Sequence, residues 1–206
     1  MTLLDEPIRY PDNGRTFFHD KGSNDELAWL EKLFQEFGSY ASGYQLGAIK
    51  LLDHALEEPR RRDFLVYPIV FLIRHYIELR LKELIQGLNY CQQQTRDFPT
   101  GHNIVNLWND FKIKYQSVGE SIADDRFKAM DNLINELGNT DPISMSFRYP
   151  VDKDGNRIQK LEKVNLTELR ETFIRVSYMF DGISMQIAHH VDITEGLLGE
   201  MYANYY

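Results

Sequence analysis

The stretch Tyr67-Pro-Ile-Val-Phe-Leu-Ile-Arg-His-Tyr-Ile-Glu-Leu-Arg-Leu-Lys-Glu-Leu-Ile85 decides the fold class. On a helix of about 3.6 residues per turn, the apolar side chains of this stretch and its continuation cover more than half of the circumference. They are Ile69, Leu72, Ile73, Tyr76, Ile77, Leu79, Leu84 and Leu88. The remaining face is a polar stripe of Arg74, His75, Glu78, Lys82 and Gln86, in which Arg74–Glu78 and Glu78–Lys82 are each four residues apart. Such a helix is too apolar for a surface and too charged along one stripe for a membrane span, so it predicts the central helix of a bundle.

Composition limits the classes of protein to which the chain can belong. It has 206 residues, 43% of them apolar, so it can bury a core as one domain, with or without a small appendage. Its net charge of −8 disfavours binding to nucleic acid and anionic lipid, so any such contact needs a local basic patch.

The single Cys91 excludes an internal disulfide and fits a reducing compartment. The N-terminus lacks the apolar region of a signal peptide, and the apolar run from Phe64 to Ile73 is too short to span a bilayer. We therefore expect a cytoplasmic protein with no membrane contact.

Helical periodicity also precedes the central stretch. Ser23 and Glu26 fit a capping box, which predicts a helix start. The apolar residues that follow on one face are Leu27, Leu30, Leu33, Phe34 and Phe37. Gly38 and Ser39 break or bend this helix, so residues 25–57 form either one helix or two.

Three more helices are predicted after a polar loop at residues 89–101. Apolar residues recur at helical spacing from Ile104 to Phe111 and from Phe127 to Leu137, where Gly138 is a C-cap. Asn165, with Glu168 three residues on, caps the last long helix. We expect an irregular segment at 1–22, a single helical domain at 23–192 and a C-terminal tail at 193–206.

One segment of this domain has the period of a strand. The apolar residues Ile143, Met145, Phe147, Tyr149 and Val151 alternate with polar residues and Pro150. Asp154-Gly155 is a strong turn signal. The pattern predicts a small β-hairpin at about 143–162, ahead of the last helix.

Three motifs together resemble the HEPN family of small all-helical domains. Arg74-His-Tyr-Ile-Glu-Leu-Arg-Leu-Lys-Glu-Leu-Ile85 is similar to the central helix of that family, and Gly101-His-Asn-Ile-Val-Asn-Leu107 to the Gly-His-Asp-Leu segment that opens its next helix. Phe147-Arg-Tyr-Pro-Val-Asp152 is similar to the Arg-Tyr-Pro element ahead of its final helix. The resemblance implies an all-α bundle of four or five helices, usually dimeric. Family members include metal-independent RNA-cleaving toxins and defence effectors, and non-catalytic versions that bind nucleotides or proteins.

The resemblance also suggests a catalytic pair. Catalytic members carry an Arg followed, after four to six residues, by a His that transfers a proton while the Arg stabilises the developing phosphate charge. Arg96 and His102 fit this spacing. Alternatively, His102 caps the start of the helix that follows it.

Two further sets of residues are candidates for ligand binding or an interface. The polar stripe, with Arg74, His75, Glu78 and Lys82, either forms a functional surface or satisfies its own charges inside the bundle. On the predicted strand, Arg148 either binds phosphate or pairs with Asp152 on the same face. Tyr149 lies beside them. His189 and His190 are adjacent on a helix and point about 100° apart, so they do not favour a metal site.

These observations lead to a ranked set of functions. We expect a HEPN-like helical module, dimeric, that binds RNA, a nucleotide or a protein partner such as an antitoxin, in a prokaryotic toxin–antitoxin or defence system. An active metal-independent endoribonuclease is the alternative, and a purely structural helical adaptor is the second alternative. The sequence contains no recognisable metal or cofactor motif, so we expect neither.

Overall fold

The computed structural model describes Tyr10, Asn13 and residues 16–18, 21–30, 36–93 and 95–203. The chain divides into two compact units, Met1–Lys32 and Leu33–Tyr206. In the first unit the capping box forms, with the Ser23 amide and hydroxyl each donating to Glu26 Oε2 at 3.0 Å. Residues 27–30 are nevertheless not helical, so the predicted helix does not begin here. Leu33 and Phe34 lie outside the described residues.

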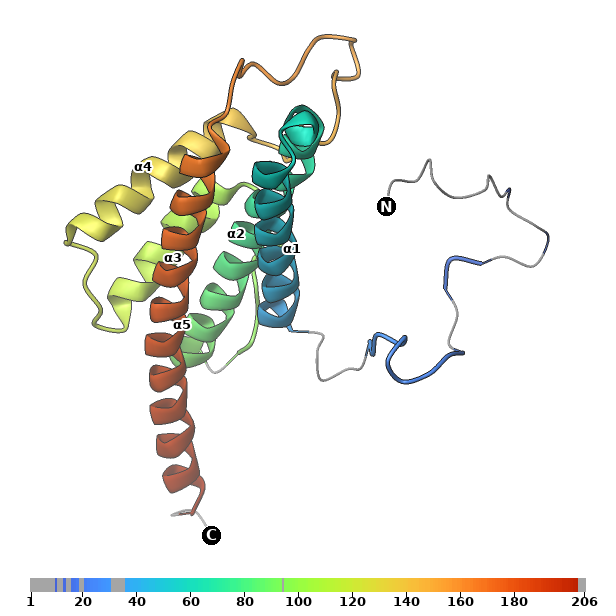
Figure 1. Ribbon diagram of the computed structural model, residues 1–206. Coiled ribbons are helices and arrows are strands. Elements are labelled where there is room, and N and C mark those ends of the chain that lie inside the picture. The colour runs from blue at the N-terminus through green and yellow to red at the C-terminus, as the bar shows by residue number, and fades with distance from the viewer. Residues whose placement is uncertain are drawn as a thin grey trace. The chain divides into compact units, whose positions relative to one another are not determined.

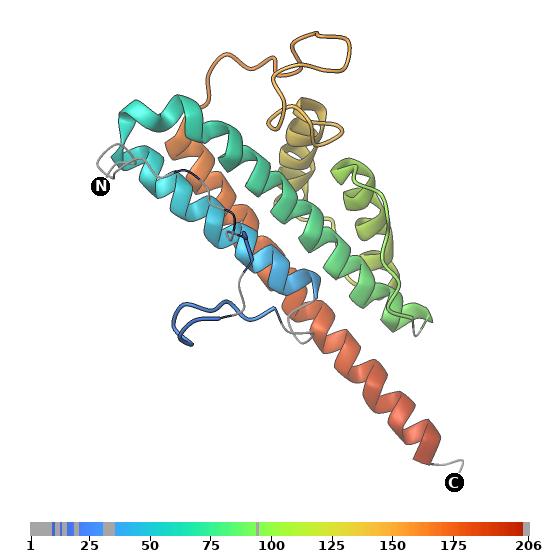
Figure 2. The same cartoon turned by 90° about the vertical axis from the view of Figure 1, so that its right-hand side faces the viewer.

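The second unit is a bundle of five α-helices (Figures 1 and 2). They are α1 (Phe37–Glu57), α2 (Arg62–Gln93), α3 (Ile104–Ser117), α4 (Asp125–Thr140) and α5 (Leu166–Ala203), with a short 3-10 helix η3 (Pro59–Arg61) before α2. The all-α prediction is confirmed. The central stretch lies in α2, against which α1, α3 and α5 all pack. None of the helices in the described ranges combines the length and hydrophobicity needed to cross a membrane.

Helices α2 and α5 lie side by side and run in the same direction. Their contacts advance together along both helices, from Tyr76 against Phe173 to Arg80 against Asp181. Gly87 allows a close approach of the two helices, because a Cβ atom there would lie 2.7 Å from a methyl group of Ile187. The N-termini of α2 and α5 are therefore at the same end of the bundle.

The core is held together by aromatic rings from four helices. Tyr76 of α2 meets Phe173 and Phe180 of α5 edge to face, and Trp108 of α3 stacks on Phe127 of α4. All five rings are at most 5% exposed. Burial of such large side chains supplies much of the driving force for folding.

The predicted β-hairpin is not formed. The carboxylate of Asp141 accepts hydrogen bonds from the backbone amides of Met145 at 2.7 Å and Ser146 at 2.9 Å, which closes the segment into turns. Ser144 has a φ of 61°, which no strand residue adopts. The only β-structure in the described part of the chain is one isolated antiparallel bridge between Val151 and Arg157.

Helix ends also differ from the predictions. Gly138 is not a C-cap but an internal residue of α4, where a Cβ atom would lie 2.5 Å from Val105 of α3. Helix α2 continues through Gln93 into the predicted loop, and α5 continues to Ala203, through most of the predicted tail. The cap at Asn165 is confirmed, since its side-chain oxygen accepts from the amide of Thr167 at 3.0 Å and that of Glu168 at 3.3 Å.

Candidate functional site

The long connection between α4 and α5 lies at the end of the bundle where α2 and α5 begin. Parallel helices whose N-termini meet at one end place the positive ends of their dipoles there and give that end a positive potential. Basic side chains add to this potential. Residues 148–163 include five basic and three acidic residues, and residues 57–63, which lead into α2, include three of each. This end is therefore locally basic although the chain carries a net charge of −8.

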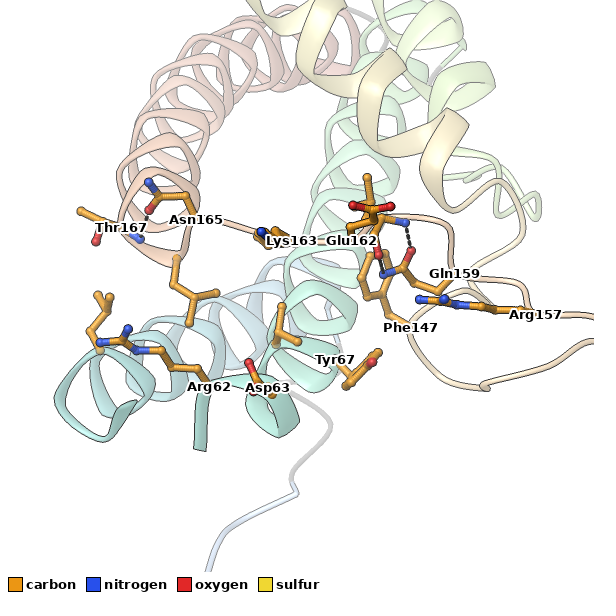
Figure 3. Close-up of a pocket in the computed structure, with 15 residues that line it drawn as sticks. Arg62, Asp63, Tyr67, Phe147, Arg157, Gln159, Glu162, Lys163, Asn165 and Thr167 are labelled. Carbon is orange, nitrogen blue, oxygen red and sulfur yellow. Dashed lines mark hydrogen bonds between the residues drawn. The ribbon is translucent and has the colours of Figure 1, made fainter. Parts of the chain in front are cut away.

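A cavity of about 580 Å³ lies between the connection and the two helix starts (Figure 3). Its polar and aromatic lining comprises Arg62, Asp63 and Tyr67 from α2, Phe147, Arg157, Gln159, Glu162 and Lys163 from the connection, and Asn165 and Thr167 at the start of α5. A second cavity of about 360 Å³ adjoins it, because both are lined by Tyr67, Phe147, Arg157 and Gln159. Arg148 and Tyr149 line only the second. We call the two cavities together the basic cleft, after Arg62, Arg148, Arg157 and Lys163.

The cations of the basic cleft are available to a ligand. Within the described ranges, Arg157 and Lys163 make no side-chain hydrogen bond and no ion pair. The side chain of Arg62 donates to the carbonyl of Ala55, at 3.3 Å. Asp63 and Glu162 are the acidic residues in the lining, and neither neutralises a specific cation of the cleft.

Arg148 is held by aromatic rings rather than by an acid. Its guanidinium carbon lies 5.6 Å from the ring centre of Phe71 and 5.4 Å from that of Tyr149, and Nη1 donates to the carbonyl of Ser144 at 3.4 Å. The carboxylate of Asp152 instead accepts from the amides of Asn156 and Asp154, at 2.8 Å and 2.9 Å. These bonds, with Asn156 contributing most, lower the pKa of Asp152. Arg148 is therefore oriented without being neutralised.

Three residues of the polar stripe of α2 form a second cluster with His102, which lies in the loop before α3. We call this set the charged cluster: Arg74, Glu78, Lys82 and His102. Glu78 accepts from Arg74 Nη1 at 3.0 Å and from Lys82 Nζ at 3.1 Å, and lies 2.7 Å from His102 Nδ1. Arg74 and Glu78 are 0% and 3% exposed. Burial by itself raises the pKa of Glu78, but the hydrogen bonds from His102, Lys82 and Arg74 outweigh it, so the pKa is lowered overall.

The charged cluster ties α2 to two loops. Arg74 Nη2 donates to the carbonyl of His102 at 2.7 Å, and Nε donates to the carbonyl of Asp141 at 3.2 Å. Asp141 in turn organises the turns that lead toward the basic cleft. The charges of Arg74 and Glu78 are therefore satisfied within one chain. This corresponds to the second of the two alternatives for the polar stripe, in which it satisfies its own charges inside the bundle.

His75 lies beside this cluster without joining it. Its ring stacks on Phe71 and meets Tyr44 of α1 edge to face, with a centroid distance of 4.4 Å. Burial lowers the pKa of His75; Glu78 opposes this effect, and the cations Arg74 and Lys82 reinforce it. The lowered pKa favours a neutral imidazole, so His75 acts here as an aromatic packing residue.

Arg96 and His102 have different partners. Arg96 donates to Glu195 of α5 at 3.2 Å and stacks on the ring of Tyr90, whereas His102 pairs with Glu78. The cap of α3 is Asn103, whose side-chain oxygen accepts from the amide of Asn106 at 3.0 Å, so the alternative of His102 as the cap is wrong. The side chain of His102 is 71% exposed.

The chain matches no protein-family model, no curated protein and no solved structure. Its chemistry therefore has to be inferred from the arrangement of its own residues. In the ranges that the structure describes, no group of three or more His, Cys, Asp and Glu side chains could hold a metal ion.

Sequence reasoning found part of the basic cleft and missed the rest. It singled out Arg148 and Tyr149, which line the smaller cavity. It missed Arg62, at the end of the run of three arginines, and Arg157 and Lys163 of the connection, because none of them belongs to a motif. The available signal was the density of basic residues in both segments, but only the fold brings the two segments together.

Proposed function

We propose that this chain is a HEPN-like helical module that binds the phosphate of an RNA or a nucleotide in the basic cleft. The observation that carries the proposal is the lining of the two adjoining cavities, to which Arg62, Arg148, Arg157 and Lys163 all contribute. In keeping with its resemblance to the HEPN family, the module acts as a homodimer in a prokaryotic toxin–antitoxin or defence system.

Phosphate suits these groups chemically. Arginine presents a planar fork of N–H donors that matches two phosphate oxygens, and lysine adds a compact charge. The start of a helix adds the positive end of its dipole, and two helices start here. Arg157 and Lys163 lose no ion pair within the described chain when they turn to a ligand.

Aromatic side chains favour a nucleotide or single-stranded RNA among phosphate compounds. Tyr67 and Tyr149 line the basic cleft and are each 45% exposed. Bases stack on such rings, and the combination of a basic groove with exposed aromatic rings is typical of single-strand binding.

The test is binding measured by fluorescence anisotropy with a labelled single-stranded RNA of about 12 nucleotides, with unlabelled ATP as competitor. Arg157→Ala and Lys163→Ala should each weaken binding about tenfold or more, since a charge-assisted hydrogen bond contributes about 1.5–3 kcal/mol. Each should also reduce the slope of log affinity against log salt by about 0.7 for a lost phosphate contact.

Lys160→Ala is the matched control. Lys160 is an exposed cation of the same connection that does not line the basic cleft, so its loss should change affinity little. Equal losses in Lys160→Ala and Arg157→Ala would show that only the general charge matters, and would contradict the proposal. Complete displacement of RNA by ATP would identify a nucleotide site, and failure of ATP to compete would identify an RNA chain as the ligand.

A further inference from the structure

An apolar cavity of about 360 Å³ lies directly beside the basic cleft. Helix α4 packs against α3, whereas α5 packs against α2 and α1, which leaves room between α4 and α5. The floor is formed by α2 through Ile73 and Ile77, and the walls by Ile134 of α4 and Phe173 and Val176 of α5. These five side chains are at most 5% exposed, so the cavity reaches core residues.

The size and lining of the cavity are those of a small-molecule site. Pockets for small ligands have volumes of about 300–1,000 Å³, are mostly apolar, and carry a few polar groups that orient the ligand. The polar groups here are Glu136, Thr140, Lys163, Asn165, Glu168 and Thr172.

The apolar cavity and the larger cavity of the basic cleft meet at the segment that leads into α5. Phe147, Leu161, Lys163, Val164 and Asn165 line both. A ligand can therefore place one group in each cavity, on either side of this segment. Lys163, which has no ion pair in the described chain, lines both cavities; Figure 3 shows it in the lining of the larger cavity of the basic cleft.

We infer that the basic cleft and the apolar cavity together bind a small amphiphilic phosphate, a phosphomonoester whose apolar body fills the apolar cavity. This inference rests on the phosphate site of the proposed function and adds the apolar half of the ligand. Glu136 and Glu168 line the apolar cavity and repel an anionic head placed there. The phosphate therefore lies on the side of Arg157 and Lys163.

The test compares octyl phosphate with methyl phosphate by isothermal titration calorimetry on the full chain. The two probes share a head group and differ only in the apolar body. Each fully buried methylene contributes about a factor of four to affinity, so burial of even two of them makes octyl phosphate bind more than tenfold tighter. We expect at least this ratio for the parent protein.

The variant Thr172→Phe separates the two halves of the site. Thr172 is a half-buried residue of α5 in the cavity wall, and a phenyl ring there fills the space. It should lower the affinity for octyl phosphate to that for methyl phosphate and leave methyl phosphate unchanged. Glu171→Phe is the matched control, because Glu171 is the preceding, exposed residue and lines no part of either site. It should change neither affinity.

A second variant covers the case in which Thr172→Phe does not fold, as judged by circular dichroism. Leu161→Ser removes an apolar wall at the junction, at a residue that is 41% exposed, and should reduce the preference for octyl phosphate at least threefold.

Equal affinities of the two probes for the parent, or a preference that survives in the variants, would overturn the inference. If RNA or ATP binds through Arg157 while the octyl chain adds nothing, the proposed function stands and only this inference fails. If neither phosphate probe nor RNA binds, both fail.

Discussion

Neutralising Glu78 should destabilise the protein strongly, because its carboxylate is the shared partner of Arg74, Lys82 and His102 in the charged cluster. Glu78 Oε2 accepts from Arg74 at 3.0 Å, and Oε1 contacts Lys82 at 3.1 Å and His102 at 2.7 Å. In Glu78→Gln one of these oxygens becomes an NH₂ group, which then faces either Arg74 or both Lys82 and His102. Removing one partner of a buried ion pair costs about 3–5 kcal/mol. Asp141 remains 3.5 Å from Arg74, so we expect the lower end, about 3 kcal/mol.

The loss should depend on pH in a defined direction. The pKa of Glu78 in the folded protein lies below its ordinary value of 4.5. The stabilisation from its ionised form is therefore fully present above the pKa of the unfolded chain and is lost as the pH falls through the folded pKa. Glutamine does not titrate. The difference in unfolding free energy between parent and Glu78→Gln should be largest above about pH 4.5 and shrink below it.

Urea unfolding followed by circular dichroism measures both effects. For a slope of about 1–3 kcal/mol per molar urea, a loss of 3 kcal/mol moves the midpoint by about 1–3 M. Glu171→Gln, at an exposed residue of α5, is the control and should stay within about 0.5 kcal/mol of the parent. A cost of Glu78→Gln below about 1 kcal/mol, or a difference that stays constant down to about pH 3, would refute the role assigned to the charged cluster.

Three other predictions concern packing, capping and assembly. Gly138→Ala should lower the unfolding free energy in urea by about 1–3 kcal/mol, because its Cβ atom would lie 2.5 Å from Val105. Gly43→Ala, whose Cβ atom would have nothing within 4 Å, should raise it by about 0.5–1 kcal/mol. Equal effects of the two substitutions would contradict the packing at Gly138. Asn165→Ala should lower stability by about 0.5–2 kcal/mol through loss of the α5 cap, and an unchanged melting temperature would contradict that role. Light scattering should give about twice the monomer mass of 24.2 kDa, and a clean monomer would remove the homodimer.

Sequence patterns correctly predicted those features of the fold that depend on residues close together in the chain. The apolar face of the central stretch predicted the buried helix α2, because a helix period places those side chains on one surface whatever surrounds them. The cap at Asn165 depends on a side chain and amides two and three residues away, so it too could be predicted. The helices α3 and α4 followed from the same periodicity.

The predicted hairpin shows where local patterns fail. Alternation from Ile143 to Val151 is a genuine strand pattern, yet Ile143 is 71% exposed and Phe147 is the one buried residue among the five apolar residues of this described segment. The carboxylate of Asp141 closes those turns, and Asp141 is itself anchored by Arg74, 67 residues earlier in the chain. A contact over that distance is invisible to a window of ten residues.

The sequence by itself determined the all-helical class, the central helix and its polar stripe, since each depends on spacing along one helix. Only the tertiary structure decided what the stripe does: two loops cover Arg74 and Glu78, so their charges are satisfied inside the chain. Only the tertiary structure brought Arg62, Arg148, Arg157 and Lys163 to one cleft, because α2 and α5 run parallel and start at the same end. Residues separated by up to about a hundred positions meet there through helix packing, and helix packing is a property of the folded chain rather than of any segment.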